Sequence, residues 1–163
     1  MAEPELVQSF RFEVLLTLSA AGTPPQLLGD GAFAECSGLE LEADVKEYLE
    51  GGFNSGVIRR VGRVKLQPLV LKRGIMVPKD GQYMDTAFWI WLMNMVSGAL
   101  PVLRCDGHVR VRNPRNTGVV AHWSFTRGLP VKLTGPALNA KTGEIAIEEL
   151  HIAHEGLKLE KAP

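Results

Sequence analysis

Leu39-Glu40-Leu41-Glu42-Ala43-Asp44-Val45-Lys46 is the stretch of this chain that decides its fold. Every odd position is apolar and every even position is charged, which is typical of a β-strand with one buried face. A second run follows at residues 64–72, and Pro68 interrupts its alternation. Because proline cannot donate to a strand ladder, Pro68 must lie at an edge, at a bulge or where pairing changes partner, and the phase change favours the bulge.

Residues 50–63 join these two half-buried strands, and we interpret them as a contact loop. The segment is too long for a tight turn and too rich in glycine for a packed element. It also carries apolar side chains at Phe53, Val57, Ile58 and Val61, which an idle linker would not need. We therefore expect a glycine-hinged loop that touches another molecule.

The chain has 163 residues, with 18 basic and 18 acidic side chains, so its formal net charge is zero. This length favours a single domain over residues 1–163. Zero net charge gives no electrostatic reason to expect an anionic membrane or sequence-specific nucleic acid as a partner. Neutral chains also tend to associate, which favours a protein that contacts other proteins.

The first eight residues carry neither the basic nor the apolar region of a secretory signal, so we expect synthesis in the cytosol. The most apolar window, residues 88–96, is far shorter than the ~20 residues that cross a bilayer, so we expect no direct membrane insertion. Cys36 and Cys105 could pair, but two cysteines suit a reducing compartment equally well, and we interpret them as buried thiols.

Most of the remaining chain predicts β-strands. Alternation predicts strands at residues 10–18 and 32–36, separated by a turn around Gly22, Pro24 and Pro25. In the second half we expect strands at residues 108–112, 119–126, 131–133 and 144–154, with a hairpin turn at residues 113–118. A change of phase at Glu148-Glu149 predicts a bulge in the last strand.

One helix is expected, from an N-cap at Asp85 or Thr86 to Gly98 as the residue after the C-cap, about 13 residues long. Both of its faces are apolar, so it is either wholly buried or in contact with another subunit. Together with the strands, and without βαβ alternation, it predicts a mainly β fold. We expect an antiparallel barrel or sandwich with one α-helix over one opening.

Candidate chemical sites are few. His151 and His154 would suggest a metal site on a helix, but their segment alternates like a strand, which sends positions three apart to opposite faces. Cys105-Asp106-Gly107-His108 brings a thiol, a carboxylate and an imidazole together, but we interpret Asp106-Gly107 as the turn before a strand. No glycine-rich run is followed by the helix or lysine of a phosphate-binding loop. We therefore expect no catalytic residues, no cofactor and no metal.

Seven short motifs occur in a characteristic order between about Phe10 and Leu159. They are Phe10-x-Phe12-x-Val14, Cys36-Ser-Gly-Leu-Glu40, Tyr48-x-Glu-Gly-Gly52, Leu69-x-Leu-Lys-Arg-Gly74, an aromatic helix around Trp89 and Trp91, Gly135-Pro-x-Leu-Asn139, and Ile145-x-Ile-Glu-x-Leu-x-Ile-x-His-Glu-Gly156. No single motif is specific, but their order and spacing resemble the phage tail tube family of contractile injection systems.

This resemblance implies hexameric rings whose strands join into one barrel around a channel and which stack through protruding loops. It makes the loop residues candidates for contacts between subunits or rings: Gly51, Gly52, Phe53, Val57, Ile58, Arg59, Arg60, Val61 and Arg63. It implies as partners further copies of the chain, a sheath protein, baseplate hub and spike proteins, and cargo in the channel. It also implies assembly in the bacterial cytoplasm, into a phage tail or phage-tail-like particle.

Several functions remain open beside the main inner tube. A baseplate-proximal tube initiator or adaptor ring shares the fold, and so does a dissociable carrier ring of a related secretion system. The remote alternative is a small β-barrel enzyme or ligand-binding module that uses Cys105, His108 or His122.

Overall fold

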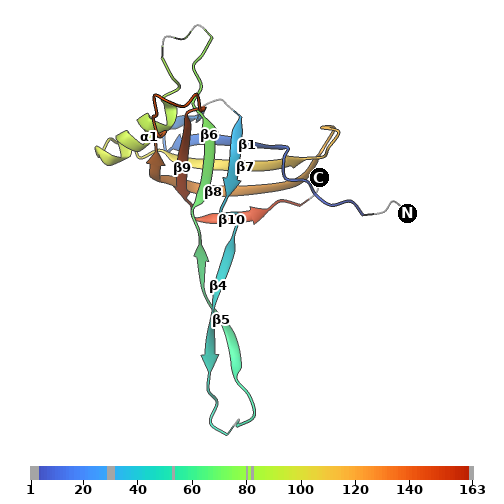
Figure 1. Ribbon diagram of the computed structural model, residues 1–163. Coiled ribbons are helices and arrows are strands. Elements are labelled where there is room, and N and C mark those ends of the chain that lie inside the picture. Colours follow the sequence, from blue (N-terminus) through green and yellow to red (C-terminus); the bar gives the residue numbers. More distant parts are fainter. Residues whose placement is uncertain (1–3, 29–31, 53, 80, 82, 162–163) are drawn as a thin grey trace.

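Antiparallel strands make up most of the protein, and a computed structural model describes residues 4–28, 32–52, 54–79, 81 and 83–161 (Figure 1). In chain order the elements of this part are β1 Phe12–Ala20, β2 Thr23–Leu27, β3 Phe33–Ser37, β4 Leu41–Tyr48, β5 Ile58–Leu66, β6 Leu69–Gly74, α1 Ala87–Val96, β7 Arg104–Arg112, β8 Val119–Thr134, β9 Ile147–Ala153 and β10 Gly156–Leu159. The mainly β fold with a single helix is as predicted.

Eight strands form the body, in the order β2-β1-β7-β8-β9-β6-β3, and β10 also pairs with β8. The long strand β8 links the two halves of this sheet, because residues 119–128 pair with β7 and residues 129–134 pair with β9. It bends between these halves at Arg127, which has a positive φ of 53°. The two halves therefore wrap around a common interior.

The core lies where the two halves and the helix meet. Its most deeply buried apolar side chains are Leu16, Leu69, Leu71, Phe88, Trp91, Cys105, Phe125, Leu150 and Ile152. Strand β6 alternates strictly between buried and half-buried residues, as a strand with one buried face should. Trp91 donates its indole N–H to the Leu103 carbonyl oxygen at 3.0 Å, which ties α1 to the segment before β7.

Two prolines that were predicted in a turn lie instead in a strand. Pro24 and Pro25 belong to β2, which pairs antiparallel with β1 and stands at the end of the sheet order. Both prolines are tolerated because they lie where the register of β1 and β2 shifts, between the pairs Leu18–Gln26 and Ala20–Thr23, and because β2 is at the end of the sheet order.

The predicted bulge at Pro68 is also wrong, because pairing changes partner there. Strand β5 ends at Leu66 and pairs with β4, whereas β6 begins at Leu69 and pairs with β3 and β9. A Cβ atom at Gly38 would collide with the Pro68 carbonyl oxygen, and Gly38 has a positive φ of 86°. The two chain segments thus cross closely where they leave the body, and glycine is what permits the crossing.

The predicted bulge at Glu148-Glu149 does not occur either. Residues from Ile147 to Ile152 pair with β6 in an unbroken register, and Glu148 is buried on the same face as Leu150 and Ile152. The carboxylate is buried because Arg73 Nε donates to its Oε1 at 2.6 Å. The alternation of buried and half-buried residues therefore continues without a break. The sequence suggested a change of phase because one buried position holds a charged residue, Glu148, which pairs with Arg73.

Three further boundaries differ from the sequence predictions. Residues 105–108 lie within β7 and not in a turn, and residues 131–133 are part of β8. The helix is ten residues long, with Thr86 as its N-cap, and Gly98 follows it with the positive φ of 75° expected after a C-cap. Cys105 is buried and Cys36 is half-buried, and both are free thiols.

Candidate assembly interface

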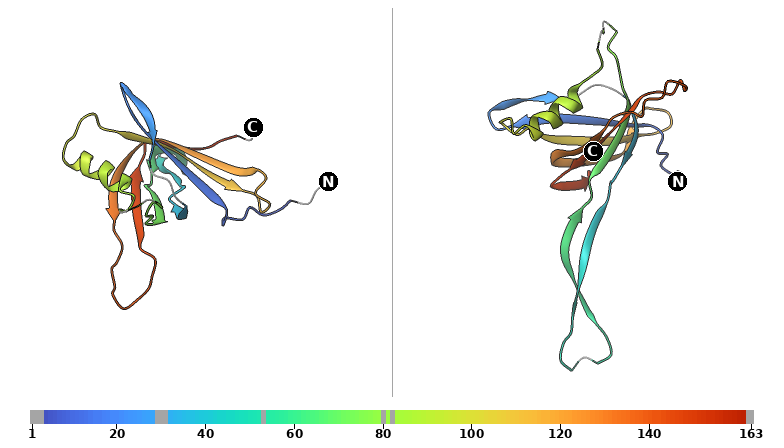
Figure 2. Two further views of the ribbon diagram at one scale, coloured as in Figure 1. Left: turned by 90° about the horizontal axis from the view of Figure 1, so that it is seen from above. Right: turned by 60° about the vertical axis from the view of Figure 1, so that its left-hand side comes forward.

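Strands β4 and β5 form a two-stranded sheet of their own, which projects from the body as a long arm (Figures 1 and 2). We call residues 41–66 the ribbon. It begins beyond the crossing of Gly38 and Pro68 and ends in a turn at residues 49–57. An isolated hairpin of two strands is marginally stable in water, so a ribbon of this length is expected to gain stability from a partner.

The ribbon has one apolar face and one charged face. Directly paired residues share a face, and the apolar one is made of Leu41, Ala43, Val45, Val61, Val64 and Leu66. The register shifts between Ala43 and Val45, where Gly62 and Arg63 lie opposite one residue, Asp44. This extra residue is a β-bulge, and it keeps Val61 and Val64 on one face although they are three positions apart.

Among the residues that the structure describes, none covers this apolar face. Leu41 and Val45 are each 61% exposed, and Val61 is 79% exposed. The alternation at residues 39–46 therefore identified the strand correctly, but the predicted half-burial is wrong within one chain. A row of exposed apolar side chains on a projecting element marks a surface for protein contact.

The charged face carries its own ion pairs. Lys65 Nζ lies 2.8 Å from Asp44 Oδ1, and the Arg60 guanidinium lies 5.1 Å from the centre of the Tyr48 ring. Near the turn, Glu47 and Arg59 pair directly at the end of the other, apolar face, where Arg59 Nε is 3.9 Å from Glu47 Oε1. Arg60 on the charged face and Arg59 at the end of the apolar face thus both have partners within the ribbon.

The predicted contact residues fall in two places. Gly51, Gly52 and Val57 lie in the turn, whereas Ile58, Arg59, Arg60, Val61 and Arg63 belong to β5. The loop is therefore shorter than predicted, and Phe53 lies outside the described residues. The prediction also left out Leu41, Val45 and Val64, which share a face with Val61. Their alternation was the available signal, but it was interpreted only as a strand with one buried face.

A second uncovered apolar surface lies on the outer side of α1. Phe88 and Trp91 are buried against the sheet, but Ile90, Met93 and Val96 on the other side are more than half exposed. The sequence predicted either complete burial of this helix or contact with another subunit. Complete burial is wrong within the single chain. The helix keeps one apolar face free.

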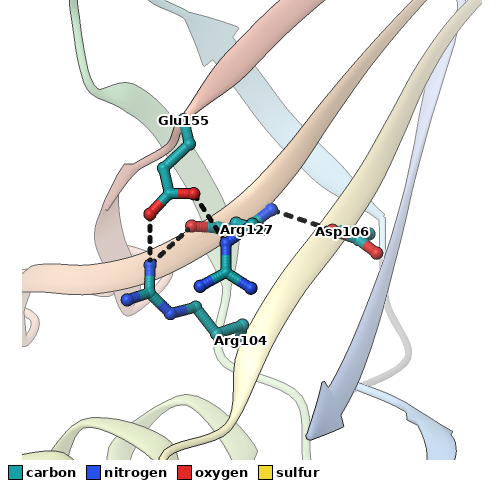
Figure 3. Close-up of polar contacts among 4 residues, drawn as sticks. All are labelled: Arg104, Asp106, Arg127 and Glu155. Atoms are coloured by element: carbon teal, nitrogen blue, oxygen red, sulfur yellow. Dashed lines mark hydrogen bonds and ion pairs between the residues drawn. The ribbon is translucent and has the colours of Figure 1, made fainter. Parts of the chain in front are cut away.

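The outer face of β7 and β8 is polar and tightly paired. Figure 3 shows three residues of these strands together with Glu155, which lies between β9 and β10. Glu155 accepts from Arg104 Nη1 at 3.1 Å and from Arg127 Nε at 2.6 Å, and Asp106 accepts from the Arg127 N–H at 2.8 Å. These bonds hold the bend of β8 at Arg127 and satisfy both carboxylates. The cluster is therefore built to fix a corner of the sheet.

The residues proposed for the enzyme alternative do not form a reactive pair. Cys105 points into the core, and burial raises the pKa of its thiol to about 12. His108 lies on the opposite face of β7, where its Nδ1 is 2.9 Å from His122 Nε2. Burial and the neighbouring His122 and Arg110 charges lower the pKa of His108. A neutral thiol and an imidazole on opposite faces cannot act as nucleophile and base.

The two C-terminal histidines do not form a metal site. His151 Nε2 contacts Glu149 Oε1 at 2.6 Å, His154 Nε2 contacts the Gln67 carbonyl oxygen at 3.1 Å, and no three or more metal-ligating side chains gather anywhere in the described ranges. The described part of the chain also contains no helix with the length and apolar character needed to span a bilayer.

An antiparallel β body with a projecting amphipathic ribbon is typical of a structural protein that acts through contacts of its outer surface. Residues 8–158 match the T4-like virus tail tube protein gp19 family, so the chain belongs to this family. The resemblance seen in the motifs is thereby confirmed. As a family member it is a tail tube-like structural protein and not an enzyme.

Solved structures of contractile injection systems share the fold. The chain is 21% identical to the anti-feeding prophage cap, a tube terminating cap, with a TM-score of 0.73 and coverage of 99% of this chain and 95% of that chain. It is 19% identical to a chain of the anti-feeding prophage baseplate, with a TM-score of 0.69 and coverage of 98% and 97%.

The chain is also 19% identical to a chain of the extended sheath-tube complex of an extracellular contractile injection system. The TM-score is 0.68, and the match covers 96% of this chain and 93% of that chain. A search of curated proteins found no match.

Proposed function

We propose that this chain is a subunit of the inner tube of a contractile phage tail or phage-tail-like injection system. Copies assemble into hexameric rings, and the rings stack around a channel through which cargo is delivered. The observation that carries this proposal is the uncovered apolar face of the ribbon, on a chain that belongs to the tail tube family. Because the described residues of its own chain leave this face uncovered, a neighbouring copy supplies the cover.

A closed ring with cyclic symmetry is favoured over open aggregation of the copies. A ring lets each copy present one surface and receive another, so that exposed apolar patches and sheet edges are satisfied in every subunit. The exposed side of α1, with Ile90, Met93 and Val96, is a second candidate surface for such contacts. The turn residues Gly51, Gly52 and Val57 contribute where the end of the ribbon meets the neighbour.

The polar outer face of β1, β7 and β8 is the candidate channel wall. Glu13 lies 3.1 Å from Arg112 and 3.8 Å from Arg110, so this one carboxylate offsets part of the positive charge of two guanidinium groups. A wet, polar wall with partly offset charges suits passage of cargo without tight binding. In this arrangement the partners are a sheath protein outside the tube and baseplate hub and spike proteins at its end, with assembly in the bacterial cytoplasm.

Electron microscopy of the purified full chain tests the proposal. Tubes or rings of uniform bore are expected, and a monomer by sedimentation velocity at the concentration used for microscopy would contradict it. The double variant Val45→Asp, Val61→Asp places two carboxylates on the apolar face of the ribbon and should abolish assembly, since charges at the centre of an interface are costly to desolvate. Lys46→Ala, on the charged face of the same ribbon, is the matched control and should still assemble.

A terminal or baseplate-proximal ring is the second candidate function. It is favoured by the fold shared with a tube terminating cap and with a baseplate chain. The same micrographs separate the two functions, because a main tube subunit elongates into tubes of many rings. A terminal or initiator subunit is expected to stop at separate rings.

A further inference from the structure

His108 on β7 and His122 on β8 lie side by side on the outer face of the body. His108 pairs with Ser124 and Arg110 pairs with His122, so the two imidazoles are diagonal neighbours on adjacent antiparallel strands. Their ring centres are 5.1 Å apart, and His108 Nδ1 lies 2.9 Å from His122 Nε2. Strands in the middle of the sheet thus hold together two side chains of the type that most often binds metals.

The separation of the two nitrogens matches binding of one metal ion at two adjacent positions. With metal–nitrogen bonds of about 2.0–2.1 Å, nitrogens 2.9 Å apart form an angle of about 90° at the metal. A tetrahedral angle of about 109° needs a separation of about 3.3 Å. The spacing therefore favours the tetragonal geometry of Cu²⁺ or Ni²⁺ over the tetrahedral geometry of Zn²⁺.

Both imidazoles can offer a lone pair to a metal without a net loss of protons. In the neutral pair, one of the two facing nitrogens donates its N–H to the other, and this proton moves to the far nitrogen of its own ring when a metal binds. Burial, followed by the charges of His122 and Arg110, lowers the pKa of His108, so its ring is neutral at pH 7. A neutral imidazole is the form that metals bind.

The pair is accessible and has charges of both signs around it. Both histidines are half-buried, and His122 lines a groove of about 740 Å³ along β8 and the C-terminal segment, which gives an ion a path of entry. Arg110 is paired directly with His122, and its charge opposes a bound cation. The carboxylates of Glu160 and Asp106 act on His108 with the opposite sign, which favours a cation.

We propose that His108 and His122 form a two-histidine binding site for Cu²⁺ or Ni²⁺. Each ring turns so that its lone pair leaves the other nitrogen and points at the shared ion. Water takes the remaining positions on the metal, because among the residues that the structure describes no third metal-ligating side chain joins the pair. The bound ion then links β7 to β8. This site does not depend on the proposed tube function.

Copper binding to the full chain, prepared without a polyhistidine tag, tests the site. Titration calorimetry in a buffer that does not bind copper gives the affinity, and pulsed EPR counts the imidazoles on the ion. One Cu²⁺ per chain with two imidazoles is expected. His108→Gln and His122→Gln should each weaken binding at least about tenfold, because a single imidazole loses the advantage of two linked ligands. His151→Gln is the matched control on another strand and should bind like the wild type.

The two thiols compete little for copper, because burial raises the pKa of Cys36 to about 11 and that of Cys105 to about 12. Lowering the pH is a second measurement that needs no variant. Since protons compete for both imidazoles, Cu²⁺ should be released between about pH 7 and about pH 5, while circular dichroism shows that the chain is still folded.

Three results would overturn the site: one imidazole or none on the ion, an affinity that is unchanged in His108→Gln or His122→Gln, or copper that stays bound at the lower pH. A chain that forms tubes and binds no Cu²⁺ overturns the metal site alone. A chain that binds Cu²⁺ as expected but forms neither rings nor tubes overturns the tube function alone.

Discussion

The buried ion pair of Arg73 and Glu148 places charged residues at core positions, so the alternation of apolar and polar residues in β9 is interrupted in the sequence although the strand is regular. Arg73 lies between Glu148, at 2.6 Å, and Asp85, at 3.0 Å, and its guanidinium lies 3.8 Å from the centre of the Phe88 ring. Both Arg73 and Glu148 are 1% exposed. This network connects β6, β9 and the start of α1, so it fixes how the helix sits on the sheet.

Glu148→Ala should destabilise the fold strongly. The substitution removes the closest carboxylate from a buried guanidinium, and breaking a buried pair in this way costs about 3–5 kcal/mol in the free energy of unfolding. Urea denaturation followed by circular dichroism measures the loss. Lys65→Ala, which removes the exposed pair with Asp44, is the control and should cost less than about 1 kcal/mol. Equal losses for the two variants would contradict the structural role of Glu148.

Two histidines should make the stability of the subunit depend on pH. Burial lowers the pKa of His154 and of His108 below their ordinary value of 6.5. The unfolded chain then binds protons at a higher pH than the folded chain does. Stability is therefore complete above pH 6.5 and falls as the pH drops from there toward the folded pKa values.

Urea midpoints between about pH 7.5 and about pH 5.5 measure this effect. We expect the midpoint to fall with pH in the wild type, and to fall less in His154→Gln, which lacks one of the two groups. A midpoint that is unchanged across this range in the wild type would show that neither histidine is linked to folding.

At the scale of elements, the packing of β7 against β8 depends on a missing side chain. A Cβ atom at Gly107 would collide with the Phe125 ring, which is buried and lies directly opposite on β8. Sequence reasoning assigned Gly107 to a turn, because glycine before an apolar run is common in turns. Its actual use is to make room for an aromatic ring from the neighbouring strand.

Gly107→Ala should therefore destabilise the body of the protein by about 1–3 kcal/mol, because the Phe125 ring must leave its position. Thermal or urea denaturation measures the change. Gly118→Ala is the matched control, since a Cβ there meets nothing within 4 Å, and its effect should stay within about 0.5 kcal/mol. A Gly107→Ala variant as stable as this control would show that the ring has room to move.

At the scale of the whole molecule, the body and the ribbon differ in how they are stabilised. The body has a core to which the helix and all of its strands except β2 contribute, whereas the ribbon has two strands with both faces in water. Local stability follows such differences in buried contacts. The ribbon is thus the part whose order depends most on assembly.

Hydrogen exchange followed by mass spectrometry should show this difference. In the dispersed subunit, amides of β4 and β5 should exchange much faster than those of β7 and β8, because a hairpin alone is marginally stable. In assembled tubes the ribbon should become protected, while β7 and β8 change little and serve as the internal reference. Equal protection of the ribbon in both states would argue against its burial by a second copy.

The sequence by itself determined most of the strands, the single helix and the family, since these depend on local alternation, capping residues and the order of motifs. The contact surface around Val61 remains a prediction. Only the tertiary structure decided that β5 begins at Ile58, that pairing changes at Pro68 and that Glu148 lies in the core. The physical reason is that alternation reports which residues share a face, whereas what covers that face depends on distant parts of the chain. For the ribbon, no part of the chain that the structure describes covers the apolar face.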